Sequence, residues 1–163
     1  MTFDTMMKEE KSNIKDIRRR IEAYCSTQER CLLEVTLKLR QWGLSQKLID
    51  SILSSLKTDK FIDEERFSIL FCRGKLLIKK WGRRKIISEL KKKQISINYI
   101  NTGIKEIDTD VYLDILRKQL YKKWKEIKEK NHLKRKKKIV NYLLQKGFES
   151  ALIWQEIEKL TDK

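Results

Sequence analysis

The side chains that could do acid–base, nucleophilic or metal chemistry are few in this 163-residue chain and lie far apart. There is one histidine, His132, and there are three cysteines, Cys25, Cys31 and Cys72. A structural zinc site needs four Cys or His ligands in closely spaced pairs, and these four residues form no such pair. We therefore expect the cysteines to be small buried hydrophobic residues of a protein kept in a reducing cytoplasm.

A cluster of carboxylates, Asp63, Glu64 and Glu65, could be taken for a metal site. Adjacent acids at the start of a helix more often cap it and interact with its positive end. We expect Asp63 to be such a cap, Glu64 to lie in the first turn, and Phe67 to enter the core. No nucleotide-binding glycine loop and no metalloprotease or serine-hydrolase motif occurs. The sequence therefore predicts a protein without catalytic residues, metal or cofactor, and not an enzyme.

Positive charge is the dominant chemical feature, with 39 Lys and Arg against 23 Asp and Glu and a net charge of +16. Residues 73–93 hold ten cations and one anion, and residues 117–138 hold twelve cations and two anions. Self-repulsion at this density destabilises the compact state and is tolerated where an anionic partner binds. Nucleic acid or an acidic protein groove would fit. A membrane surface is disfavoured because the apolar residues are needed for the core.

We expect partner or DNA contacts from the exposed cations of these two segments. They are Arg73, Lys79, Lys80, Arg83, Arg84, Lys91, Lys92, Lys122, Lys125, Arg135 and Lys136. Trp81 and Trp124 lie beside cations, but both also fall on apolar stripes. Core packing is therefore favoured over base stacking for these two rings.

The elements that must position these residues are helices, because the chain has no proline and only five glycines. Ser26 and Glu29 have the spacing of a capping box, and glycines and polar caps divide the rest. An apolar stripe runs from Phe67 through Leu70 and Leu77 to Trp81. The predicted helices span about 13–25, 27–42, 45–57, 63–80, 83–93, 96–107, 110–130, 133–146 and 149–161.

An internal repeat appears when Gly43, Gln94 and Gly147 are aligned. Apolar residues then share columns, which are Leu39/Leu90/Leu143, Leu44/Ile95/Phe148, Ile49/Ile100/Ile153, Leu53/Ile104/Ile157 and Leu56/Ile107/Leu160. Each copy, with the helix before it, forms a three-helix module of about fifty residues. The sequence predicts an all-α fold of three tandem three-helix repeats in an elongated array. The predicted divisions are a tail at 1–12, repeats at 13–57 and 58–107, and a third at 108–163, the last two basic.

Three stretches of the chain carry a family pattern. They are Tyr24-Cys25, Glu29-Arg30-Cys31, Glu34, Lys38-Leu39 and Trp42-Gly43; then Phe61 to Phe67 with Gly82, Ile86, Glu89-Leu90 and Ile95; then Tyr142-Leu143-Leu144 and Lys146-Gly147-Phe148. In this order and spacing the chain resembles the RecX regulatory proteins, bacterial modulators of the RecA recombinase. Gln94, Ser68 and Cys31 depart from the residues usual in that family, which are glycine, alanine and serine. The matching positions Asp63, Glu64, Phe67, Gly82, Leu90, Gly147 and Phe148 are expected to be mainly structural.

The resemblance implies a curved, elongated protein that binds along the helical groove of the RecA–DNA filament. Such proteins limit filament extension, ATP hydrolysis and strand exchange, which places them in homologous recombination, DNA repair and control of the SOS response. No cofactor or catalytic residue accompanies that role. The implied partners are the RecA filament and single-stranded or duplex DNA, reached directly or through RecA. We expect a cytoplasmic monomer that does not bind membranes.

Two other functions remain open. A stand-alone basic helical module would bind nucleic acid with a steep salt dependence and without a recombinase. A structural adaptor would instead dock a partner helix on an exposed apolar patch. The sequence does not distinguish capping of filament ends from internal disruption of a filament.

Overall fold

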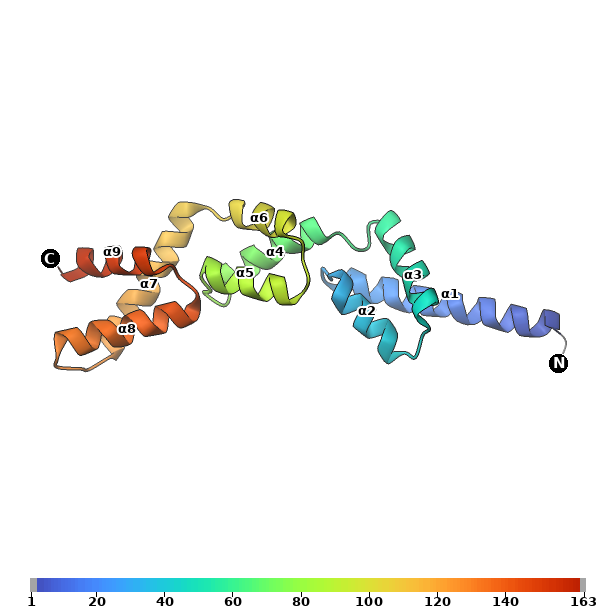
Figure 1. The fold of residues 1–163 in the computed structure, drawn as a ribbon, viewed down its shortest axis with the longest axis horizontal. Helices are drawn as coiled ribbons and strands as arrows, with labels where there is room; N and C mark the ends of the chain where they lie inside the picture. Colours follow the sequence, from blue (N-terminus) through green and yellow to red (C-terminus); the bar gives the residue numbers. More distant parts are fainter. Residues whose placement is uncertain (1–2, 162–163) are drawn as a thin grey trace. The chain divides into compact units, whose positions relative to one another are not determined.

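The computed structural model describes residues 3–161, with side chains from residue 13 onward. Over that range the chain is all-α, as predicted, with nine helices and no strand (Figure 1). The helices are α1 Phe3–Thr27, α2 Leu32–Gln41, α3 Gln46–Thr58, α4 Glu64–Leu77, α5 Arg83–Lys92, α6 Ile97–Lys105, α7 Thr109–Glu126, α8 His132–Lys146 and α9 Ser150–Thr161. Among these described helices, none combines the length and apolar character needed to cross a bilayer.

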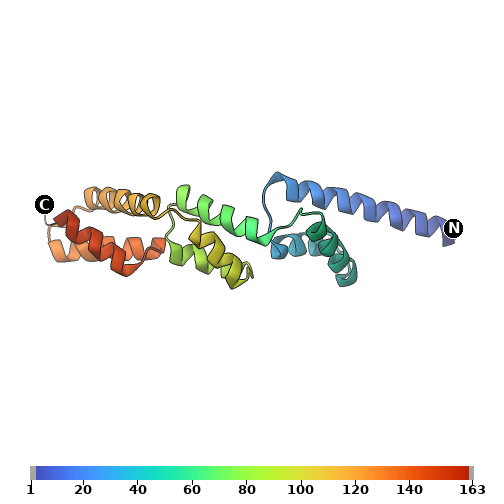
Figure 2. The same cartoon turned by 90° about the horizontal axis from the view of Figure 1, so that it is seen from above.

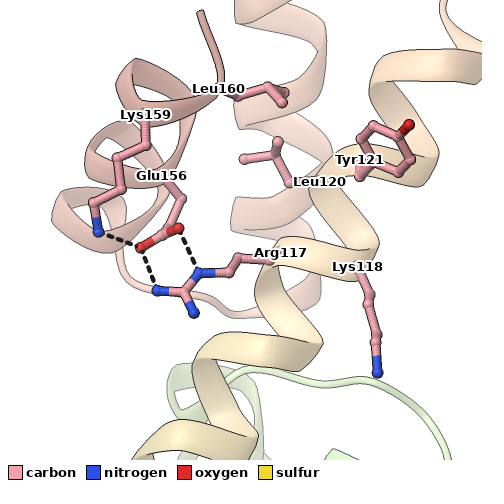
Figure 3. Close-up of a pocket in the computed structure, with 7 residues that line it drawn as sticks. All are labelled: Arg117, Lys118, Leu120, Tyr121, Glu156, Lys159 and Leu160. Atoms are coloured by element: carbon pink, nitrogen blue, oxygen red, sulfur yellow. Dashed lines mark hydrogen bonds and ion pairs between the residues drawn. The ribbon is translucent and has the colours of Figure 1, made fainter. Parts of the chain in front are cut away.

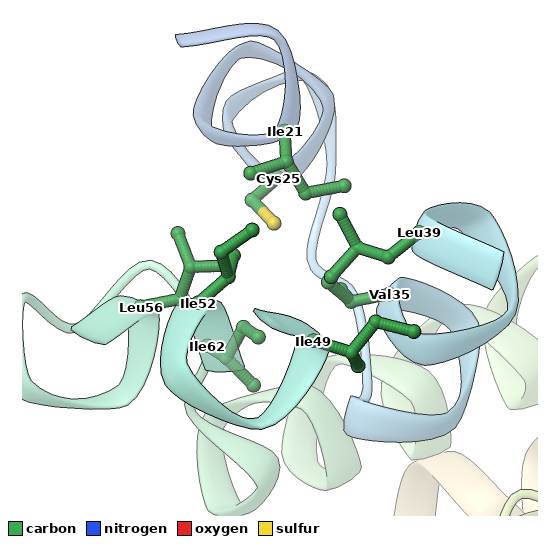
Figure 4. Packing of buried hydrophobic residues seen from close by; sticks show 8 residues of the cluster. All are labelled: Ile21, Cys25, Val35, Leu39, Ile49, Ile52, Leu56 and Ile62. Atoms are coloured by element: carbon green, nitrogen blue, oxygen red, sulfur yellow. The ribbon is translucent and has the colours of Figure 1, made fainter. Parts of the chain in front are cut away.

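The chain forms two compact units, which we call unit 1 (residues up to Phe67) and unit 2 (Ser68 onward). The core of unit 1 lies where α1, α2 and α3 meet. Ile21 and Cys25 from α1 point toward Val35 and Leu39 from α2 and toward Ile49, Ile52 and Leu56 from α3 (Figure 4). Each helix therefore contributes one apolar face, and none of the three could bury that face alone.

The start of unit 1 corrects two sequence predictions. α1 begins at Phe3, ten residues earlier than predicted. Ser26 caps no helix, because it lies at the end of α1 and its hydroxyl donates to the Glu22 carbonyl at 2.8 Å. α2 begins at Leu32, five residues later than predicted, and the Glu34 carboxylate in its first turn accepts the N–H of Cys31 at 3.3 Å. Glu29 forms a longer-range ion pair with Arg66 instead, at 2.7 Å.

Unit 2 contains most of α4 and all of α5 to α9. In Figure 2, α7, α8 and α9 lie side by side, and they contact one another pairwise. Their shared core includes Tyr112, Leu116, Ile139 and Ile153, all fully buried. The face of α4 differs from the predicted stripe, since Leu70 and Leu77 are exposed while Cys72 and Leu76 are buried. The predicted period is helical, but the buried face is rotated around the helix.

The turn that aligns the three repeats has the same backbone conformation in each copy. Gly43, Gln94 and Gly147 all have positive φ, at 78°, 60° and 92°. The left-handed conformation is natural for glycine and strained for glutamine. The flanking columns Leu39/Leu90/Leu143 and Ile49/Ile100/Ile153 are at most 1% exposed. The repeat read from the sequence is therefore a repeat of backbone geometry and of core positions.

A close backbone contact ties the start of α5 to the turn between α8 and α9. The Gly82 N–H donates to the Lys146 carbonyl at 2.8 Å, and the Arg84 N–H donates to the Gly147 carbonyl at 3.0 Å. A Cβ on Gly82 would lie 2.3 Å from backbone atoms of Gly147 and Phe148. We call this contact the glycine junction. It requires glycine at residue 82 because the two backbones touch there.

All three cysteines are buried reduced thiols, as predicted. Cys72 packs with Ser68 where α6 crosses α4 at Gly103. Burial raises the pKa of the Cys72 thiol to about 11, and this effect outweighs the hydroxyl of Ser68, which acts to lower the pKa. This thiol is therefore protonated at neutral pH, which is the state expected of a packing residue and not of a nucleophile.

Candidate partner-binding surface

Almost all of the net positive charge of the chain lies in one of the two units. Unit 2 has 26 Lys and Arg against 11 Asp and Glu, a net +15, while unit 1 has 13 against 12. Unit 1 is thus nearly neutral, and any interaction driven by charge involves unit 2. The predicted contact residues all lie in unit 2, but the structure places them in three different situations.

Two of the predicted arginines hold unit 2 together. Arg83 at the start of α5 lies over the ring of Tyr112, 3.9 Å from its centre, and pairs with Glu149 at 3.5 Å. The Tyr112 hydroxyl accepts the Arg83 N–H at 3.0 Å and donates to Glu149. Burial and the Glu149 hydrogen bond together raise the pKa of Tyr112 far above its usual value. Arg83 is half-buried in this network, so its charge is already compensated.

Arg135 has a similar internal role in α8. Its guanidinium lies 4.4 Å from the ring centre of Trp124 and donates a hydrogen bond to the backbone carbonyl of Trp124. Lys136, next along the helix, donates to the Thr161 hydroxyl at 3.3 Å. Both side chains are half-buried, so they tie α8 to α7 and α9 more than they face solvent.

Four predicted cations have local partners on or beside their own helix. Lys92 pairs with Glu89 at 2.7 Å, and Lys122 pairs with Glu126 at 3.8 Å. These lysines lower the pKa values of Glu89 and Glu126, the latter mainly through Lys123. Lys125 covers the ring of Tyr121 at 4.3 Å, and Lys80 donates to the Leu77 carbonyl. Exposed pairs of this kind contribute little to stability and exchange readily with a partner.

The remaining predicted cations, Arg73, Lys79, Arg84 and Lys91, are exposed or at the surface with no ion pair among the described residues. The structure adds a second group that sequence reasoning missed. It surrounds the turn from α7 to α8 and consists of Lys128, Lys130, Lys134 and Lys137, again exposed and unpaired in the described chain. We call this second group the turn cluster. Its signal in the sequence is the lack of any acid three or four positions from Lys134 or Lys137.

The turn cluster lies where a helix tolerates positive charge least well. α8 begins after the cap Asn131, whose side chain accepts the Lys134 N–H at 2.9 Å. The start of a helix carries a partial positive charge, yet residues 134–138 are five consecutive cations. Only Lys138 of these has a carboxylate partner in the described chain, Glu129 at 3.0 Å. An external anion or carboxylate would relieve this repulsion.

Several aromatic rings of unit 2 have the ammonium or guanidinium group of a nearby cation over their faces. Trp81 has Lys75 at 5.1 Å and Lys85 at 4.8 Å from its ring centre, and Tyr142 has Lys123 at 4.6 Å. Trp81 and Trp124 are half-buried, so the predicted core packing is only partial. With cations on their faces, these rings do not form an open platform on which bases could stack.

The family-motif residues make contacts within the fold. Asp63 caps α4, accepting the Arg66 N–H at 2.9 Å, and Glu64 accepts the Leu32 N–H at 3.2 Å. Phe67, Leu90 and Phe148 are buried, while Gly82 and Gly147 make the glycine junction. Within the described residues, no three His, Cys, Asp or Glu side chains come together as metal ligands would.

Comparison with known proteins identifies two of the repeats. The sequence model of the second three-helix domain of RecX matches residues 63–103, and that of the third three-helix domain matches residues 110–157. A regulatory protein RecX from Lactobacillus johnsonii is 29% identical over 92 residues, which cover 56% of this chain. The chain spans only about a third of that relative's length, 34%.

Solved structures share the fold. The crystal structure of RecX from Lactobacillus salivarius superposes with a TM-score of 0.82 at 22% identity, covering 93% of this chain and 99% of that one. A second crystal structure of a regulatory protein RecX gives a TM-score of 0.81 at 20% identity, covering 89% of this chain and 71% of that one. At these identities the likeness concerns the arrangement of helices.

Proposed function

The chain belongs to the RecX family, and from that premise we propose that it binds a RecA–DNA filament and limits filament extension, ATP hydrolysis and strand exchange. In this role it regulates recombination, DNA repair and the SOS response in the cytoplasm. It acts as a monomer and by binding alone, without a cofactor or catalytic residue. The repeat divisions at 13–57, 58–107 and 108–163 remain predictions.

The observation that best supports this proposal is the net +15 of unit 2, set beside a nearly neutral unit 1. Part of this charge is not used in folding, because the side chains of Arg73, Lys79, Arg84, Lys91 and the turn cluster have no ion-pair partner in the described chain. Unpaired surface cations accelerate encounter with an anionic partner and make its affinity sensitive to salt. A nucleoprotein filament offers both phosphates and carboxylates.

ATP hydrolysis by RecA on single-stranded DNA tests the proposal directly, with this protein added well below one molecule per RecA subunit. We expect strong inhibition that weakens as salt is raised. Inhibition at such ratios would mean action on filament ends or across several subunits. Normal ATP hydrolysis at all ratios would refute the proposal.

A matched pair of variants tests the surface. The first changes Lys128, Lys130, Lys134 and Lys137 to Gln, and the second changes four exposed lysines of unit 1, Lys15, Lys47, Lys57 and Lys60, to Gln. Both lose four charges. We expect only the turn-cluster variant to lose inhibition at unchanged helicity. Equal loss in both would mean that net charge matters and the position of the cations does not.

The run of cations at the start of α8 also supports a second candidate function, direct binding of nucleic acid without RecA. For duplex DNA, each phosphate contact adds about 0.9 to the slope of log affinity against log salt. Binding to bare DNA at physiological salt, together with normal ATP hydrolysis by RecA, would favour this second function. The faces of Trp81, Trp124 and Tyr142 are occupied by cations, which argues against base stacking on these three rings.

A further inference from the structure

A groove between α7 and α9 has a counterpart one repeat earlier, between α4 and α6. The groove between α4 and α6, which we call the inner groove, is lined by Arg73, Leu76 and Leu77 on α4 and by Ile107 just after α6. The outer groove is lined by Arg117, Leu120, Tyr121 and Leu160. Arg117, Leu120 and Tyr121 on α7 stand 44 positions after Arg73, Leu76 and Leu77 on α4. Leu160 on α9 stands 53 positions after Ile107, which follows α6. The two grooves are therefore the same feature of successive repeats.

The inner groove shows what this feature holds. Its lining is completed by Asp108 and Val111, which are the cap and the first turn of α7. The Asp108 carboxylate accepts the Val111 N–H at 2.8 Å, so the segment in this groove is a capped helix start. With that segment in place, a hollow of about 260 Å³ remains. The outer groove measures about 760 Å³, and no helix of the described chain covers it.

The walls of the outer groove are apolar and its rim is basic. In Figure 3, Leu120 and Leu160 lie between Tyr121 and the ion-paired group of Arg117, Glu156 and Lys159, and Lys118 lies apart from this group. Tyr121 is 51% exposed, which is high for an aromatic ring lining a groove. Glu156 is buried and accepts from Arg117 at 2.7 and 3.2 Å and from Lys159 at 2.8 Å, which lower its pKa.

The rim has changed sign between the two repeats. Lys159 stands where the inner groove has Glu106, and Lys118, which pairs with Asp114 at 2.7 Å, adds a third cation, so three cations face two carboxylates and the rim stays net positive. Glu156 is the one carboxylate among the lining residues and is already held by two of these cations. The outer groove is thus complementary to an aliphatic side chain accompanied by acids, which is what a helix start with acidic first-turn residues presents.

We propose that the outer groove binds the first turns of an amphipathic helix from a partner protein, with an aspartate cap and an aliphatic residue three positions later. The inner groove supplies the template for this mode, because Asp108 and Val111 have that spacing. The partner helix would place its aliphatic residue between Leu120, Tyr121 and Leu160, with its acids at the basic rim. This inference does not depend on the proposed function, since it concerns a site other than the unpaired cations.

A synthetic peptide of residues 107–120, acetylated and fluorescently labelled, is the probe, because it carries the segment held in the inner groove. We expect saturable binding to the full-length protein by fluorescence anisotropy. Leu160→Lys and Tyr121→Ala should each weaken it about tenfold or more, as expected for the loss of one large apolar contact. Trp154→Ala, which changes an exposed residue of α9 outside the groove, should not.

Changes in the peptide complete the test. Replacing Val111 by Ser or Asp108 by Lys in the peptide should abolish binding to the unchanged protein. Absence of binding, or binding equal in all protein variants, would overturn the proposal. Concentration-dependent self-association of the protein that Leu160→Lys removes would overturn the choice of occupant, because a second copy would then fill the groove. Peptide binding is measured without RecA, so its failure is separate from failure of the proposed function.

Discussion

Replacing Gly82 by alanine should separate the backbones that meet at the glycine junction. The added Cβ would lie 2.3 Å from the Gly147 carbonyl carbon, its oxygen and the Phe148 nitrogen. All three are backbone atoms, so no flexible side chain can move aside. The start of α5 must therefore shift away from the turn between α8 and α9.

The cost follows from the contacts that this shift disrupts. Two backbone hydrogen bonds cross the junction, from Gly82 to Lys146 and from Arg84 to Gly147, and each contributes about 0.5–1.5 kcal/mol. The hydrogen bond from the Arg83 N–H to Tyr112 lies within one residue of the clash and loses its geometry too. Alanine restricts the unfolded chain more than glycine does, which returns about 0.4–1 kcal/mol. We expect Gly82→Ala to lower the free energy of unfolding by about 2–3 kcal/mol.

Gly74→Ala is the matched control for this prediction. Gly74 lies within α4, and a Cβ there would meet nothing within 4 Å. Removing a glycine from a helix should raise stability by about 0.5–1 kcal/mol. Urea unfolding followed by circular dichroism compares both variants with the unchanged protein. The reasoning fails if Gly82→Ala is as stable as the unchanged protein, or if Gly74→Ala is destabilised as much as Gly82→Ala.

Three further predictions concern single residues. Gln94→Gly should raise the free energy of unfolding by about 0.5–1 kcal/mol, because Gln94 has a φ of 60°; urea unfolding measures this, and a loss of stability would contradict it. Arg83→Ala should lower the free energy of unfolding by about 1–3 kcal/mol and Arg84→Ala by less than about 0.5, because only the side chain of Arg83 has internal partners; urea unfolding measures both, and similar values would contradict the assignment. Cys72 should react slowly with iodoacetamide at pH 9, where a pKa of about 11 leaves about 1% thiolate against about half in the unfolded chain; mass spectrometry would show rapid labelling if this thiol were accessible.

The sequence predicted the helices well where a cap was local. Ser45, Ser96 and Asp108 stand at or just before the predicted helix starts at residues 45, 96 and 110, and each accepts the N–H of the residue three positions later. The prediction that Ser26 begins a helix was wrong, because a serine hydroxyl near the end of a helix can also donate to a carbonyl of that helix, here the carbonyl of Glu22. Glu29 does not form the predicted capping box, because its carboxylate accepts a hydrogen bond from Arg66, which stands 37 positions later in the chain. The spacing of a capping box does not record such a distant competitor.

The candidate surface was predictable to the extent that charge pairing is local. Lys92 and Lys122 have acids three and four positions away, and these are the acids they contact. Arg83 could not be assigned in this way, since Tyr112 and Glu149 stand 29 and 66 positions later. Its two partners come together only when repeats two and three pack into unit 2. Charge density in the sequence therefore located the basic segments but not which cations face solvent.

Lys134 offers a test in which stability and binding should move in opposite directions. It lies in the first turn of α8, where a carboxylate would interact favourably with the helix dipole and could close a capping box with Asn131. Lys134→Glu also places an acid four residues before Lys138. We expect the free energy of unfolding of this variant, measured by urea unfolding, to be about 0.5–1 kcal/mol higher than that of the unchanged protein. Its inhibition of RecA, measured by ATP hydrolysis, should nevertheless be weaker. A variant that gains stability while losing inhibition cannot be explained by unfolding, so the lost function must come from the lost cation. A variant that gains stability and inhibits normally would remove Lys134 from the binding surface.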